Sequence, residues 1–164
     1  MLGSWRTVRR DTAKAVEEMP EQEMGFRPVE GMLTFHETAQ HILHSGHILT
    51  GLLLDGEMNL ATPAFRESFP KYIAQLPDTS TREALVQTLL QEVEQRVTEL
   101  EAQSPTFWEQ IMTRFDGQQV TRLEMLQFVK EHELTHRSQL FMYQRLKGMV
   151  PVTTRRRLAK QSAK

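Results

Sequence analysis

The chain contains no cysteine among its 164 residues. Disulfide bonds, thiolate metal ligands and a cysteine nucleophile are therefore excluded. A metal bound here would need histidine, carboxylate or water ligands, and any thiol chemistry would need a thiol from outside the protein. The absence of cysteine fits a reducing compartment, and we expect a cytoplasmic protein.

Long apolar runs are also missing. No segment approaches the roughly 20 apolar residues that cross a bilayer. The N-terminus carries Trp5, Arg6 and Arg9 where a signal peptide would need an apolar stretch. We therefore expect no membrane partner.

Outside the end of the chain there is no net positive charge. The net charge is −1, but the last dozen residues carry +5, which leaves −6 for the rest. These basic residues are Arg155, Arg156, Arg157, Lys160 and Lys164. The mildly acidic body argues against a broad nucleic-acid surface. We expect residues 1–152 to form a single domain and residues 153–164 to form a flexible basic tail.

Helical periodicity, in contrast, is abundant. Apolar stripes predict long helices over residues 4–19, 34–54, 80–103 and 121–146, the first with Ser4 as its N-cap. The other three begin with predicted capping boxes, formed by Thr34 and Glu37, Ser80 and Glu83, and Thr121 and Glu124. No alternating strand pattern is visible. The fold class is therefore all-α, a four-helix bundle.

Two segments lie between the predicted long helices. Residues 58–78 contain three prolines and a short apolar patch, which predict an ordered crossover with a helical turn. A connection of this length lets the third helix start at either end of the bundle. Residues 107–115 predict a short extended or helical lid over one end, near which a substrate would enter.

The last helix places His132 and His136 four residues apart on its apolar face. Residues at this spacing lie one turn apart, so both imidazoles can bind one metal ion. A single buried histidine is commonly a hydrogen-bonded core residue, whereas a pair on one apolar face favours a metal. Glu133 is turned about 100° from His132 and is not an evident ligand.

The second helix carries four histidines that do not share one face. His41 falls at the edge of the apolar side and is expected to point inward, where it would complete a three-imidazole site with an open position. Zinc or nickel would suit such a site, with iron and manganese as alternatives. His36, His44 and His47 fall on the polar side, together with Gly51, and are expected to be solvated. A weak second metal site there is the alternative.

Residues 132–136 also spell the zinc-protease signature His-Glu-x-x-His. That class needs a third ligand downstream and a strand that aligns the substrate. No acidic residue follows Glu133 and no histidine follows His136, so the downstream ligand is missing and we interpret the match to the protease signature as coincidental.

A di-iron carboxylate bundle is the other rival, because Glu133 and His136 form Glu-x-x-His. Such a site needs a second motif of this kind and two further inward glutamates. Glu37 and His41 have the wrong spacing. We set this interpretation aside.

The chain resembles the DinB/YfiT-like family of metal-binding four-helix bundles. Two segments carry the resemblance: residues 34–42, which contain His41, and residues 131–140, which are similar to the family's His-x3-His-Arg-Gly-Gln-Leu. Arg27-Pro28 and Lys147-Gly148 also stand where that family would place them, and Ser138 replaces the usual glycine.

The resemblance implies that His41, His132 and His136 bind one divalent metal, with solvent completing the shell. It also implies an up-down-down-up bundle, commonly a homodimer. Two related branches, the mycothiol-dependent maleylpyruvate isomerases and the bacillithiol transferases, use such a metal to activate a low-molecular-weight thiol.

Two functional hypotheses follow. In the first, the protein is a metal-dependent enzyme for a small-molecule substrate, a thiol S-transferase or a hydrolase, in which Gln139 or Arg137 orients the ligands. In the second, it is a non-catalytic, metal-binding or stress-related dimeric bundle.

Overall fold

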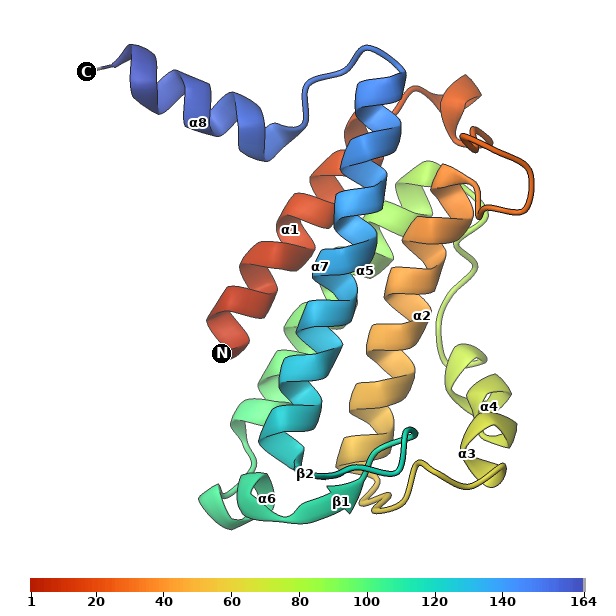
Figure 1. Cartoon of the computed structure of the whole chain (residues 1–164), viewed down its shortest axis with the longest axis vertical. Helices are drawn as coiled ribbons and strands as arrows, with labels where there is room; N and C mark the ends of the chain where they lie inside the picture. Colours follow the sequence, from red (N-terminus) through yellow and green to blue (C-terminus); the bar gives the residue numbers. More distant parts are fainter. Residues whose placement is uncertain (164) are drawn as a thin grey trace.

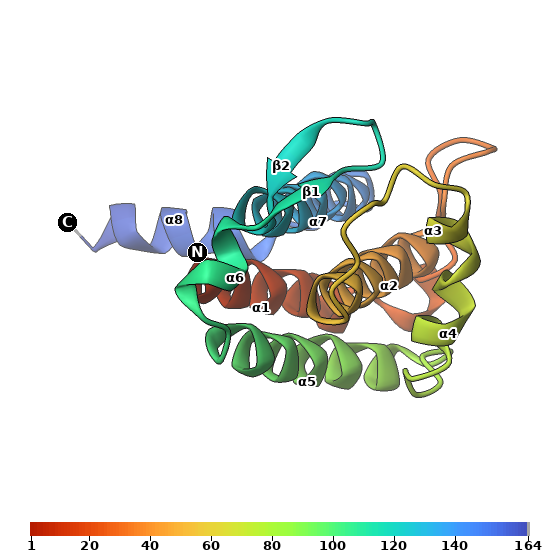
Figure 2. The same ribbon diagram turned by 90° about the horizontal axis from the view of Figure 1, so that it is seen from below.

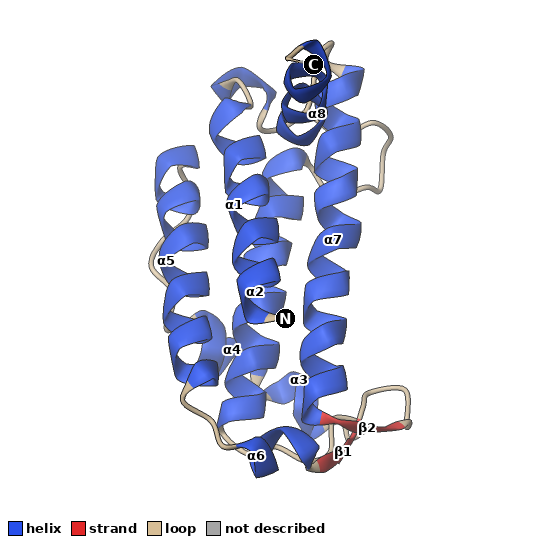
Figure 3. Ribbon diagram, turned by 90° about the vertical axis from the view of Figure 1, so that its left-hand side faces the viewer, coloured by secondary structure: helices blue, strands red, loops and turns tan. Residues whose placement is uncertain are grey.

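A computed structural model describes residues 1–163, in which four long helices lie side by side (Figures 1 and 3). They are α1 (Leu2–Glu18), α2 (Phe35–Leu54), α5 (Arg82–Glu101) and α7 (Arg122–Leu146). In Figure 1, α1 and α7 run upward whereas α2 and α5 run downward. Helix α7 packs most extensively on α2, and α1 on α5. The all-α bundle is confirmed.

Local capping explains where these helices begin. The capping boxes at Thr34 and Thr121 are confirmed. Each threonine hydroxyl accepts a hydrogen bond from the backbone N–H of the glutamate three residues later, and the side chain of that glutamate accepts one from the backbone N–H of the threonine. The box at Ser80 is wrong: Thr81 caps α5, and Ser80 instead donates to Asp78 Oδ2 at 2.8 Å. Helix α1 begins at Leu2 after Met1, not at Ser4, and has no side-chain cap.

The core is divided into two apolar clusters by a polar layer. One cluster joins the N-terminal end of α1 to the C-terminal half of α2, and the other joins the opposite halves of these helices. The buried polar side chains at the level between them are Arg9, Thr12, His47, Glu92 and Glu133. Burying charge is costly without partners, so this layer constrains how the helices pair.

The crossover contains two short helices, α3 (Ala64–Glu67) and α4 (Phe69–Ile73), rather than one turn. Helix α4 packs against α2, where Tyr72 donates to Asp55 Oδ2 at 2.7 Å. The Tyr72 ring lies so close to Gly51 that an added Cβ would be 2.6 Å from it. Gly51 is therefore buried at a packing contact and does not belong to a polar face.

The segment after α5 forms helix α6 (Pro105–Glu109) and an antiparallel pair of strands, β1 (Ile111–Thr113) and β2 (Gln119–Thr121). The segment 107–115, expected to be extended or helical, is thus helical in its first part and extended in its second, and its three-residue strand is too short to show alternation in the sequence. Figure 2 shows this hairpin at the end of α7, with α3 and α4 beside α2. A hydrogen bond from Leu60 N to Thr113 O, 2.8 Å long, ties the crossover to the hairpin.

The basic C-terminal segment is helix α8 (Val152–Ser162), which projects from the bundle in Figure 1. Its cations pair with the acidic body: Arg155 contacts Glu18, and Arg156 lies 2.9 Å from Asp11. The segment expected to be a flexible tail is thus helical, and the division into residues 1–152 and 153–164 stays a prediction.

A short 3-10 helix, η1 (Glu21–Glu23), follows α1. Within residues 1–163, none of the helices combines the length and the apolar character that crossing a membrane requires.

Candidate metal centre

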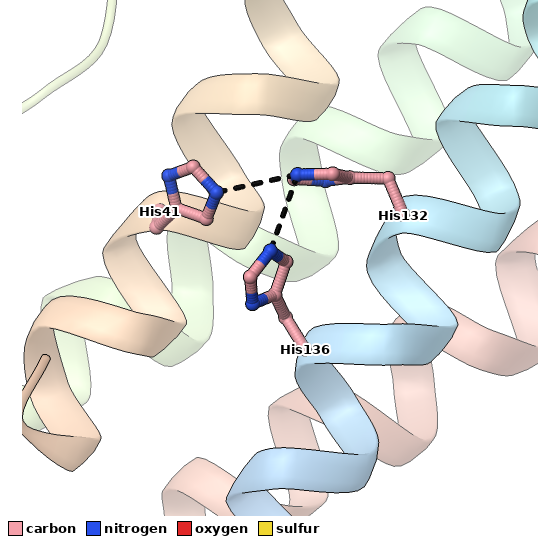
Figure 4. Close-up of side chains that lie close together, drawn as sticks. All are labelled: His41, His132 and His136. Carbon is pink, nitrogen blue, oxygen red and sulfur yellow. Dashed lines mark hydrogen bonds between the residues drawn. The ribbon is translucent and has the colours of Figure 1, made fainter. Parts of the chain in front are cut away.

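Three histidines from two helices, His41 of α2 and His132 and His136 of α7, point toward one another (Figure 4). His132 Nε2 lies 3.3 Å from His41 Nε2 and 3.2 Å from His136 Nε2. One ring nitrogen of each histidine lies within 4.8 Å of the other two, and all three side chains are half-buried. The structure therefore brings together the three histidines that the sequence singled out.

The geometry fits a metal ion. Imidazole nitrogens about 2.0–2.1 Å from a tetrahedral ion lie about 3.3 Å apart. The two separations at His132 Nε2, 3.3 and 3.2 Å, match this value. Three neutral imidazoles leave a further position for solvent or substrate, so these residues can hold a divalent metal with an open site.

Gln139 sets the proton position on one of these rings. Its Oε1 lies 2.8 Å from His136 Nδ1. Because the amide oxygen only accepts, Nδ1 carries the proton and donates it, which leaves the lone pair of His136 on Nε2. The outward hydrogen bond of a metal-ligating histidine has this role, and Gln139 supplies it one turn along α7.

The site favours neutral imidazoles. Burial, and then the nearby His136 and His41, lower the pKa of His132 to about 4. Burial, followed by His136 and His44, also lowers the pKa of His41 below its usual range. Both rings are therefore unprotonated at neutral pH, which is the state that binds a metal.

Acid should destabilise the metal-free protein through His132. Between pH 6.5, the ordinary pKa of a histidine side chain, and a pH of about 4, the unfolded chain binds a proton at His132 that the folded protein does not. The free energy of unfolding therefore falls as the pH falls through this window. Urea denaturation at several pH values in this window should show that His132→Gln loses less free energy of unfolding on acidification than wild type does. Equal losses would contradict the assignment.

Glu133 is not a ligand, but it is not a bystander either. Its carboxylate is buried and accepts hydrogen bonds from Trp5 Nε1 at 2.8 Å, Arg9 Nε at 2.9 Å and Thr12 Oγ1 at 2.9 Å. Arg9 also pairs with Glu92 at 2.8 Å. The sequence carried a signal for this network, because Arg9 lies one turn from Trp5 on the apolar stripe of α1.

The remaining histidines do not form a second site. His47, expected to be solvated, is 6 % exposed and faces α5, where Arg96 Nη2 lies 3.1 Å from its Nδ1 and Glu92 Oε1 lies 3.4 Å away. His36 and His44 are half-buried. Within residues 1–163, only the triad forms a group of three or more potential metal-ligating residues.

Arg137 and Ser138 point away from the triad. Arg137 Nη1 lies 3.6 Å from Asp11 Oδ2 on α1, so the alternative in which it orients ligands is wrong. Ser138 is exposed and its hydroxyl donates to Leu134 O of the same helix at 2.8 Å. The serine in place of glycine therefore leaves the ligands untouched.

A cleft of about 600 Å³ opens beside His132. It is lined by Ser45, Ile48, Leu49, Phe65, Arg66, Phe69, Phe115, Phe128 and His132. Phe115 alone of the segment 107–115 reaches it. Phe107 lies instead beneath the guanidinium of Arg122, whose carbon is 4.2 Å from the ring centroid. The cleft is lined by side chains from α2, α3, α4, α7 and the hairpin, and the expected entry of substrate near residues 107–115 stays a prediction.

The fold and the triad define a class: a four-helix bundle with a three-histidine site that can hold a metal. The DinB superfamily profile matches residues 4–140, which cover most of the chain. The protein belongs to the DinB superfamily, and the resemblance seen in its motifs is confirmed.

Solved structures support the same fold. A DinB-like protein of Bacillus subtilis, YjoA, is 23 % identical, with a TM-score of 0.70 over 91 % of this chain and 92 % of that one. A protein of Exiguobacterium sibiricum assigned to the DinB family is 24 % identical, with a TM-score of 0.64 over 90 % and 89 %. A mycothiol-dependent maleylpyruvate isomerase is 18 % identical, with a TM-score of 0.57 over 85 % of this chain but 60 % of its own. No curated protein matches the sequence.

Proposed function

We propose that the protein is a divalent-metal-dependent enzyme that transfers a low-molecular-weight thiol to a small electrophile. The observation that carries this proposal is the convergence of three imidazole nitrogens beside an open cleft. We propose His41, His132 and His136 as the metal ligands, with zinc or nickel preferred and iron or manganese as alternatives.

A metal held there would act as a Lewis acid and lower the pKa of a bound thiol or water. The chain itself has no cysteine, so the thiol must be a separate molecule. In the transfer, the thiol proton leaves to solvent, a sulfur–carbon bond forms, and the bond between carbon and its leaving group breaks. The name of the mycothiol-dependent isomerase supports a thiol co-substrate for a bundle of this shape.

The same site could activate water, which makes a hydrolase the nearest alternative. A non-catalytic metal-binding or stress-related bundle is the second candidate. The cleft favours an enzyme over a non-catalytic bundle, since a purely structural metal site is closed. A homodimer and a cytoplasmic location stay predictions.

Thiol transfer should require both metal and an external thiol. Untagged protein is stripped with a chelator, reloaded with zinc or nickel, and assayed with bacillithiol, mycothiol, glutathione and other small thiols against chlorodinitrobenzene. We expect stoichiometric metal and faster thioether formation than with metal-free protein. Bound metal without acceleration by any thiol would favour the non-catalytic bundle, and failure to bind metal would overturn the proposal.

A further inference from the structure

The cleft beside His132 is lined mainly by apolar side chains and carries positive but no negative charge. Most of its lining is aromatic or aliphatic, its single permanent cation is Arg66, and it contains no carboxylate. We propose that this cleft binds a substrate with a planar apolar body, and that Arg66 binds an anionic group on the same molecule. This inference rests on the proposed function, because it identifies the class of electrophile that would meet the activated thiol.

The cleft's aromatic rings form a continuous series that ends at the triad. Phe69 and Phe65 have centroids 4.8 Å apart, and Phe65 stacks at 16° on Phe115, 6.2 Å away. Phe115 lies 5.1 Å from Phe128, whose centroid is 6.1 Å from that of His132. A planar molecule bound along this series would have one end at the metal ligands.

These rings are not ordinary core residues. Four of the eight phenylalanines of the chain line this one cleft, and none of the four is fully buried. Phe115 is 41 % exposed. Clustered apolar side chains left open to water mark a binding surface, and they come here from α3, α4, the hairpin and α7.

Arg66 supplies the charge selectivity. Among residues 1–163, its guanidinium has no ion-pair or hydrogen-bond partner. The nearby Arg114, whose guanidinium carbon is 5.7 Å from the Phe128 centroid, is already paired with Asp116. A free guanidinium is suited to bind a carboxylate, sulfonate or phosphate through two hydrogen bonds.

The volume limits the size of the ligand. About 600 Å³ lies within the range of roughly 300–1,000 Å³ typical of small-molecule sites. The expected ligand is an aromatic or conjugated compound with one negative charge.

Two fluorescent probes of similar shape test this proposal: anilinonaphthalene sulfonate, which is anionic, and phenylnaphthylamine, which is neutral. Both are titrated into the full chain with and without zinc. Arg66→Gln should weaken binding of the anionic probe about fivefold to tenfold and leave the neutral probe unchanged. Phe115→Ala should weaken both probes. Circular dichroism verifies that each variant is folded.

Arg157→Gln is the matched control, because it removes one exposed positive charge on α8, at the opposite end of the molecule from α3 (Figure 1). It should leave both affinities unchanged. The proposal is overturned if neither probe binds, if Arg66→Gln has no effect on the anionic probe, or if it weakens both probes equally. Probe binding without metal binding would overturn only the thiol-transfer function, and metal binding without probe binding would overturn only this inference.

Discussion

Replacing Glu133 with alanine should lower the free energy of unfolding by about 3–5 kcal/mol. The side chain of Arg9 is completely buried, and its Nε lies 2.9 Å from the Glu133 carboxylate, which accepts a hydrogen bond from it. Although burial opposes the charge, Glu133 and Glu92 outweigh it and raise the pKa of Arg9. Without Glu133, Arg9 keeps only one carboxylate partner, and Trp5 and Thr12 lose an acceptor each. A loss of this size is a large part of the stability of a small domain.

Urea denaturation at low temperature measures this effect. Glu131→Ala is the matched control: it removes an exposed carboxylate two residues away that accepts a side-chain hydrogen bond from Gln127, and it should change stability by less than about 1 kcal/mol. The double variant Arg9→Met, Glu133→Leu should recover part of the loss, because both partners of a buried pair are then apolar. A Glu133→Ala variant as stable as the control would show that the network contributes little.

Alanine at any member of the triad should weaken metal binding by at least about 100-fold, because loss of an outer partner alone costs roughly 10–100-fold. His41→Ala removes the single proposed ligand from α2, whereas His132→Ala and His136→Ala remove proposed ligands from α7. Two remaining imidazoles leave an incomplete site. Gln139→Ala should have a smaller effect, since it acts by orienting His136.

Metal content by elemental analysis and affinity by competition with a chromophoric chelator measure these losses. His36→Ala and His44→Ala, on the same helix as His41 but outside the triad, should retain wild-type affinity. Circular dichroism separates loss of a ligand from loss of the fold. Wild-type affinity in folded His41→Ala would show that the pair on α7 binds metal alone or that the ion lies elsewhere.

Glu133 and the histidine triad make their contacts on different sides of α7. Glu133 and His132 are adjacent and therefore point about 100° apart on the helix. Anchoring Glu133 against α1 turns His132 and His136 toward α2, where His41 meets them. The buried ion pair thus has a positional role in addition to its energetic one.

Several features followed from local sequence. Two capping boxes, the ends of α2 and α7 and the shared face of His132 and His136 depend on residues within about four positions of each other. The error at Ser80 has the same local origin, since Asp78 competes for its hydroxyl. Helical periodicity alone also placed His41 at the inward edge of α2.

The misassigned residues share a different feature. His47 was assigned to a polar face and Glu133 to no role, because a helical projection does not show which neighbours a charged residue will meet. His47 is buried by α5, and Glu133 by α1, each far away in the chain. The sequence assigned residues 107–115 only as extended or helical and did not predict helix α8, because the signals of these elements are too short or too polar.

The sequence by itself determined the helical fold class, the family and the three histidines, because periodicity, capping and motif spacing are encoded within single helices. Only the tertiary structure decided that His41 lies 3.3 Å from His132, that Glu133 anchors the core and that four phenylalanines gather beside the site. Those facts depend on how helices distant in sequence rotate and pack against one another. That packing is set by burial and charge pairing summed over the whole chain.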